Sequence, residues 1–142
     1  MTIESILKWF RVAKPEPTTR DIATQIGCHF EEVSEMMNAM GFIEIGERVN
    51  AFASEWKKGE YDCVINGMSK HRKIKLLDAL CDQVVTAAGV AEFMGMDFEG
   101  GLNEVNASNW SKFNEDGRPD LDENGKIKKG PHCFKPNLEK FV

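Results

Sequence analysis

Apolar side chains recur along this chain at the spacing of one face of an α-helix. Two segments show the spacing clearly: Val33, Met36, Met37 and Met40 in the first, and Leu77, Leu80, Cys81, Val84 and Ala88 in the second. Steps of three and four residues predict amphipathic helices, each with one buried stripe. We therefore expect an all-α fold, an antiparallel helical bundle in which the two stripes are buried against each other.

Residues that start and stop helices place the expected boundaries. A first helix over about 3–12 should end at the proline-rich stretch 14–17, and Thr18 or Thr19 should cap a second helix that reaches Met40. Later helices are expected over about 48–58, from 69 to Gly89 or Met94, and over 102–113. The stretch 61–67 stays open between a strand, a loop and a helix fragment.

The remaining segments should form turns. We expect residues 98–101 to bend the chain, because two consecutive glycines stand there. Asp116-Gly117 and Asn124-Gly125 are typical of hairpin turns. The tail is therefore predicted to form a short C-terminal hairpin-like flap.

Length and charge limit the function classes. The chain has 142 residues, which suits one domain over 1–142. A net charge of −5 gives no electrostatic reason to expect nucleic acid or an anionic membrane as a partner. No apolar run approaches the roughly 20 residues of a membrane span, and the first residues show no signal-peptide pattern. A soluble, cytoplasmic protein is expected.

Carboxylates line the border of both apolar stripes. Glu32 and Glu35 stand three residues apart in the first segment, and Asp78 and Asp82 stand four apart in the second. Either spacing puts both acids on one helix face, where like charges repel unless something positive compensates them. Converging carboxylate oxygens suit a hard divalent cation, Mg²⁺ or Mn²⁺, especially one that carries phosphates.

These acids stand in runs that resemble a known enzyme family. The runs are Gln25 to Val33, Glu32-x-x-Glu35, Leu77 to Asp82, Asn106 to Lys112, and Gly125 to Pro131. Together they resemble the MazG-like all-α nucleoside triphosphate pyrophosphohydrolases, in particular the phage and bacterial members similar to phosphoribosyl-ATP pyrophosphohydrolase. The first acidic position of the second motif holds Lys75 here. We therefore expect Asp82 to supply the fourth ligand.

The resemblance implies an activity and a set of residues. A (deoxy)nucleoside triphosphate would be hydrolysed to the monophosphate and pyrophosphate with Mg²⁺ bound by the four acids. Glu31 would orient or deprotonate the water. Asn109 and Lys112 would face the substrate, and Lys129 would either close over the triphosphate or remain solvated. Trp110 would either stack on a base or pack.

The resemblance and the open apolar faces both point to a homo-oligomer, a dimer or a tetramer. Two alternatives to an enzyme remain. Ala23, Gly27 and Val33 have the spacing of a helix-turn-helix, although its second helix would bring Glu31, Glu32 and Glu35 to the phosphates of DNA. The other alternative is a non-catalytic helical interaction module whose acids form a solvated face.

Overall fold

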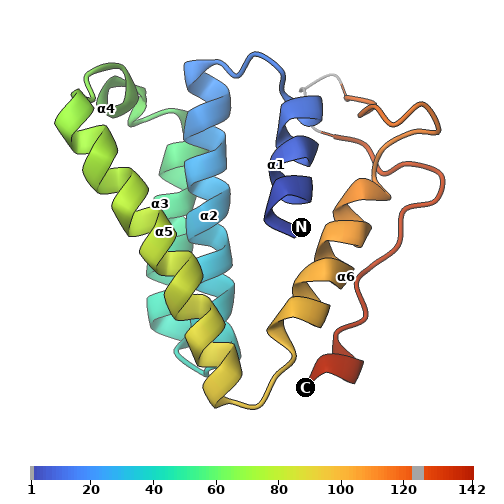
Figure 1. Ribbon diagram of the computed structural model, residues 1–142. Coiled ribbons are helices and arrows are strands. Elements are labelled where there is room, and N and C mark those ends of the chain that lie inside the picture. Colours follow the sequence, from blue (N-terminus) through green and yellow to red (C-terminus); the bar gives the residue numbers. More distant parts are fainter. Residues whose placement is uncertain (1, 123–126) are drawn as a thin grey trace. The chain divides into compact units, whose positions relative to one another are not determined.

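Helices account for the regular structure of residues 2–122 and 127–142, which the computed structural model describes (Figure 1). They are α1 (Thr2–Ala13), α2 (Thr19–Ala39), α3 (Ile43–Lys58), α4 (Asp62–Asn66), α5 (Lys70–Phe93), α6 (Phe98–Trp110) and the 3-10 helix η1 (Glu139–Phe141). The prediction of an all-α fold is confirmed. The antiparallel bundle stays a prediction.

The chain divides into two compact units. Unit 1 consists of Met1–Glu16 and Leu76–Val142, and unit 2 of Pro17–Lys75. Helix α5 begins in unit 2 and ends in unit 1. No described helix combines the length and the apolar character that crossing a membrane requires.

In unit 2, α2 begins at a capping box formed by Thr18, one of the two residues predicted to cap this helix. The Thr18 hydroxyl accepts from the Asp21 backbone N–H at 3.2 Å, and the Asp21 carboxylate accepts from the Thr18 backbone N–H at 3.0 Å. These two bonds satisfy donors that a helix N-terminus otherwise leaves unpaired. From there α2 runs through Gly27 without a break and lies against α3 (Figure 1).

Small residues form the contact between α2 and α3. Gly27 is buried, and a Cβ built on it would lie 2.7 Å from the Ala53 carbonyl oxygen. About two helical turns further along, the buried Ser34 hydroxyl donates to the Gly46 carbonyl at 2.7 Å. The two backbones therefore approach closely because side chains are small or absent at both crossing points.

The stripe of α2 that packs against α3 differs from the predicted one. Met36 and Met40 are 49% and 55% exposed, whereas Ala23, Gly27 and Ser34 are buried. The helix thus turns its small residues toward α3. The reason is that α3 brings Gly46 and Ala53 to the same face, and a methionine would not fit between them.

In unit 1, aromatic rings hold α1 against α6. The rings of Trp9 and Phe113 stack with centroids 5.3 Å apart, and Trp110 meets Phe113 edge-on at 5.4 Å. The Trp9 indole N–H donates to the Asn109 carbonyl at 2.9 Å. The indole therefore contributes apolar area to the contact while its polar atom stays paired.

Helix α6 starts before the predicted position. The stretch 98–101, expected to bend the chain, forms the first turn of this helix, because the Asp97 side chain caps it by accepting from the Gly100 backbone N–H at 2.9 Å. The helix also ends sooner than predicted, at Trp110. Lys112 consequently lies in the turn that follows.

The tail returns along unit 1 to α6. The buried Ser108 hydroxyl donates to the Phe134 carbonyl at 2.7 Å, and the Asp97 N–H donates to the Phe141 carbonyl at 2.9 Å. Glu104 accepts from the Asn137 backbone N–H, and this bond lowers the pKa of its carboxyl. The tail is thus tied to both ends of α6.

The predicted flap is present in part. Leu121 and Ile127 form an isolated antiparallel bridge, and Gly117 has the positive φ of a turn residue. The predicted turn at Asn124-Gly125 lies outside the described residues.

Candidate functional site

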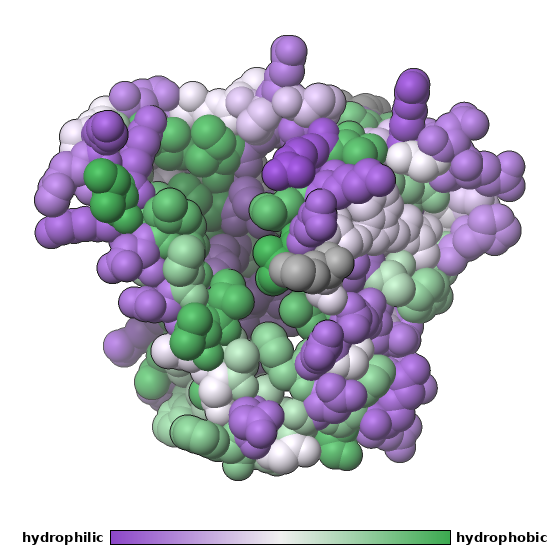
Figure 2. Space-filling view, in the orientation of Figure 1, coloured by the Kyte–Doolittle hydropathy of each residue, from purple (hydrophilic) through white to green (hydrophobic). Residues whose placement is uncertain are grey.

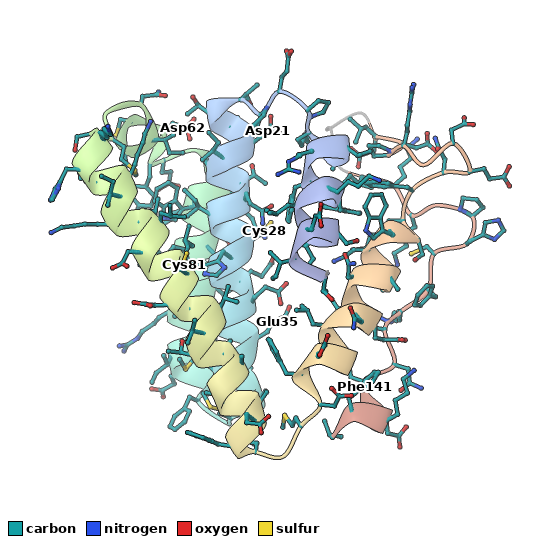
Figure 3. All side chains as sticks on the ribbon, viewed as in Figure 1. Asp21, Cys28, Glu35, Asp62, Cys81 and Phe141 are labelled. Atoms are coloured by element: carbon teal, nitrogen blue, oxygen red, sulfur yellow. The ribbon has the colours of Figure 1, made fainter. Side chains whose placement is uncertain are left out.

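The first group of candidate residues lies on α2, in unit 2. Glu32 and Glu35 are exposed, and Figure 3 shows Glu35 on the C-terminal half of the helix. Glu31, the candidate catalytic residue, is half-buried and pairs with the ammonium group of Lys57 on α3 at 2.5 Å. The positive group expected to compensate this acidic cluster is therefore present beside Glu31.

Sequence reasoning had not singled out Lys57. Its position is visible only in the packing, because Gly27, four residues before Glu31, allows α3 to approach until Lys57 Cγ lies 2.6 Å from where a Gly27 Cβ would stand. A salt bridge between partly exposed groups contributes little to stability. Its effect here is to hold the Glu31 carboxylate in one place.

The second group lies on α5, in unit 1. Asp78 and Asp82 are both exposed, one helical turn apart. The apolar residues beside them, expected to be buried, are exposed as well: Leu77 is 63% and Val84 52% accessible. Lys75, at the position where the family motif has an acid, is exposed too.

Each acid pair belongs to a different unit. Within the described residues, no group of three or more His, Cys, Asp or Glu side chains is arranged to hold a metal ion. Each helix presents two carboxylates on one face, and oxygen ligands of this kind fit Mg²⁺ chemically.

The third group comes together within unit 1. The Lys112 ammonium group donates to the Asn109 side-chain oxygen at 2.7 Å, as their spacing of three residues predicted. The backbone N–H of Gly130 donates to the Lys112 carbonyl at 2.9 Å, so the exposed Lys129 stands next to the same turn. All three predicted substrate-binding residues therefore lie at one end of α6.

Gly130 makes this approach possible. A Cβ built on Gly130 would lie 2.4 Å from the Phe113 carbonyl oxygen and 2.9 Å from that of Lys112. Any larger residue would push the tail away from the turn that holds Lys112. Gly130 therefore fixes the position of the backbone next to Lys129.

Other residues of the family-like run from Asn106 to Lys112 are structural. The Asn106 amide and the Trp110 indole N–H both donate to the Ser5 hydroxyl, at 2.9 and 3.0 Å. Of the two roles considered for Trp110, the described contacts are those of packing. The run therefore serves two purposes, with one face bound to α1 and another presenting Asn109 and Lys112.

A pocket of about 540 Å³ opens beside Trp110. Glu4, Ser5 and Lys8 of α1 complete its lining. Lys8 had not been singled out, because in the sequence it stands among the polar residues of an ordinary amphipathic helix. Its cationic group adds a positive charge to the same end of unit 1 as Lys112.

The continuous course of α2 bears on the DNA-binding alternative. A helix-turn-helix requires a turn between its two helices, and Gly27, where that turn was expected, is helical and buried. No family model, curated protein or solved structure matches this chain. The likeness to MazG-like enzymes thus stays a prediction from the motifs.

Proposed function

We propose that this chain is a Mg²⁺-dependent nucleoside triphosphate pyrophosphohydrolase, with Mn²⁺ as a possible substitute. Water would add across the bond between the α- and β-phosphates of a nucleoside triphosphate, a deoxynucleotide or a modified one, to give the monophosphate and pyrophosphate. The proposal includes a cytoplasmic homo-oligomer. It excludes nucleic acid and membrane partners.

The observation that carries the proposal is the assembly of Asn109, Lys112 and the segment of Lys129 at one end of α6. The Lys112 ammonium group has three donors, and its bond to Asn109 uses one of them. Two more are thus suited to phosphate oxygens. Lys129 next to the same turn adds a second cation where a triphosphate needs its charge balanced.

The acids supply the other half of the chemistry. Glu32 and Glu35 on one helix, and Asp78 and Asp82 on another, offer exposed carboxylate oxygens that suit Mg²⁺. When bound, the ion neutralises phosphate charge and lowers the pKa of water. Glu31, held by Lys57, would accept the proton of the attacking water.

A substrate panel tests the proposal. The purified chain is incubated with canonical and modified NTPs and dNTPs, with and without Mg²⁺, and pyrophosphate and orthophosphate are measured separately. We expect Mg²⁺-dependent release of pyrophosphate, lost in Glu35→Gln and kept in Glu47→Gln, a matched exposed acid on α3. Release of orthophosphate alone would point to a different phosphatase chemistry.

The non-catalytic interaction module is the second candidate function. The exposed apolar residues of α5 favour it, because surface patches of this kind commonly bind other proteins. Absence of any Mg²⁺-dependent product across the panel would support this alternative.

A further inference from the structure

Helix α5 exposes a long apolar surface. Every residue from Ser69 to Ala87 is exposed, and the large apolar side chains among them include Ile74 at 58%, Leu77 at 63% and Val84 at 52%. Figure 2 shows apolar side chains open along α5, interrupted by charged ones. Most of the stability of a helix in a protein comes from packing of its apolar face, so this face needs a partner.

Apolar residues of α5, most of them exposed, follow the repeat of a coiled coil. Ile74, Leu77, Cys81, Val84 and Ala88 are separated by alternating steps of three and four residues. This period of 3.5 residues keeps one seam facing a second helix. Cys81, expected to be buried, is an exposed free thiol near the middle of the seam (Figure 3).

We propose that this seam docks on the same seam of a second copy of the chain, with the two α5 helices antiparallel. The distribution of charge along α5 favours pairing with a second α5 helix in the antiparallel direction. Residues 70–75 carry four positive charges, and residues 76–93 carry three negative ones. Parallel pairing would place the basic ends together, whereas antiparallel pairing separates them and places each basic end beside Glu92 of the other helix.

Residue size agrees with this arrangement. In the antiparallel register that aligns the seams, Leu77 of one copy faces Ala88 of the other, and Cys81 faces Val84. Large residues thus meet small ones, as close packing requires. The two-fold axis repeats each contact, which is the rule for a symmetric dimer.

The acids of the proposed site stay outside this seam. Asp78 and Asp82 each follow a seam residue by one position, so the pairing leaves their carboxylates at its edge. The dimer deepens the homo-oligomer part of the proposed function, and no step of the hydrolysis is needed for it.

The mass of the chain in solution gives the first test. Sedimentation velocity should give twice the chain mass of 16.0 kDa, and Val84→Lys should reduce it to that of one chain. The matched control is Phe93→Lys, nine residues or half a turn away around the helix and 93% exposed. It should remain a dimer. Equal helical circular dichroism would show that both variants fold.

Thiol cross-linking gives the second test. The two Cys81 residues would lie about 4.5 Å apart along the axis, on helices whose axes are about 8–10 Å apart. A short bis-maleimide, which adds one thiol to each end, can span that distance. A covalent dimer should form in Cys63→Ser and be lost in Cys81→Ser, because Cys63 is exposed but lies outside the seam.

Three results would overturn the proposal: a monomeric wild type, a dimer that Val84→Lys leaves intact, or cross-linking that proceeds without Cys81. None of these readouts involves nucleotide. A dimer without pyrophosphate release would refute only the proposed enzyme, and pyrophosphate release from a monomer would refute only the dimer.

Discussion

Glu31 and Glu35 lie one turn apart on α2 and have different surroundings. Glu31 is half-buried and paired with Lys57, whereas Glu35 is exposed near the end of the helix. Glu35 also stands three residues after Glu32 and four after Glu31, so its negative charge is repelled from two sides. A side chain that adds repulsion without packing is a candidate for binding a cation.

The first prediction is that Glu35→Gln abolishes Mg²⁺-dependent turnover without destabilising the fold. Removing one of three neighbouring negative charges relieves repulsion of about 0.2–0.5 kcal/mol per pair. Thermal melts without metal should therefore show an unchanged or slightly higher midpoint. A clear loss of stability would instead assign Glu35 a structural role.

The second prediction concerns Lys112. Lys112→Ala removes a charged donor, worth about 1.5–3 kcal/mol, and should weaken binding of a non-hydrolysable triphosphate by roughly ten- to a hundred-fold. Binding of Mg²⁺ alone should not change. Isothermal titration with metal, and then with metal and nucleotide, separates the two.

The control for Lys112 is Lys135→Ala, which removes an exposed lysine from the same unit. It should leave nucleotide affinity as in the wild type. If both variants lose the same affinity, the effect reflects the general charge of unit 1, and Lys112 has no place in the site.

At the scale of elements, several helix ends were predicted correctly, whereas α3 begins at Ile43, about five residues before its predicted start. Thr18, one of the two residues predicted to cap α2, does so, and α3 ends at Lys58 as predicted, because such signals depend on neighbouring residues alone. The prediction of which face of α2 packs against another helix was wrong. That face depends on which small residues α3 brings opposite, and the period of α2 by itself does not contain that information.

The start of α6 was also predicted incorrectly, because it depends on contacts that the local sequence does not reveal. Two glycines at 100 and 101 favour a bend on composition, but the Asp97 cap outweighs them. Gly100 is also where Phe141 of the returning tail approaches, since a Cβ there would lie 2.5 Å from its ring. A glycine kept for a tertiary contact is indistinguishable in the sequence from one kept for a turn.

The third prediction tests the close contact of α2 and α3. In Gly27→Ala the new methyl group would meet Lys57 Cγ at 2.6 Å and the Ala53 carbonyl oxygen at 2.7 Å. Such overpacking costs about 1–3 kcal/mol, more than the roughly 1 kcal/mol by which alanine favours a helix over glycine. The free energy of unfolding in urea should fall.

Gly89→Ala is the matched control in another helix. No atom lies within 4 Å of a Cβ built on Gly89, so only the helix preference of alanine remains, and stability should rise by about 1 kcal/mol. If both substitutions stabilise the chain, α2 and α3 pack less closely than described.

At the scale of the whole molecule, the candidate residues are divided between the two units, Glu31, Glu32 and Glu35 in unit 2 and the others in unit 1. The sequence predicted part of the grouping of Asn109, Lys112 and Lys129. Asn109 and Lys112 are three residues apart, a spacing that puts two side chains on one helix face. The sequence did not predict the approach of the tail, because that approach depends on the contact of Gly130 with the turn after α6. The joint action of the two acid pairs stays a prediction.

The last prediction measures whether the two acid pairs act on one ion. If Glu35 of unit 2 and Asp82 of unit 1 bind the same Mg²⁺, removing either breaks the site, and removing the second costs less than it does alone. A double-mutant cycle with Glu35→Gln and Asp82→Asn should therefore give a coupling energy of about 0.5–3 kcal/mol in Mg²⁺ affinity. Pairing Glu35→Gln with Glu99→Gln, an exposed acid of α6, should be additive within about 0.5 kcal/mol. Additivity in the first cycle as well would mean that α2 and α5 bind metal separately or not at all, and Asp82 would then lose its role as the replacement for the acid absent at Lys75.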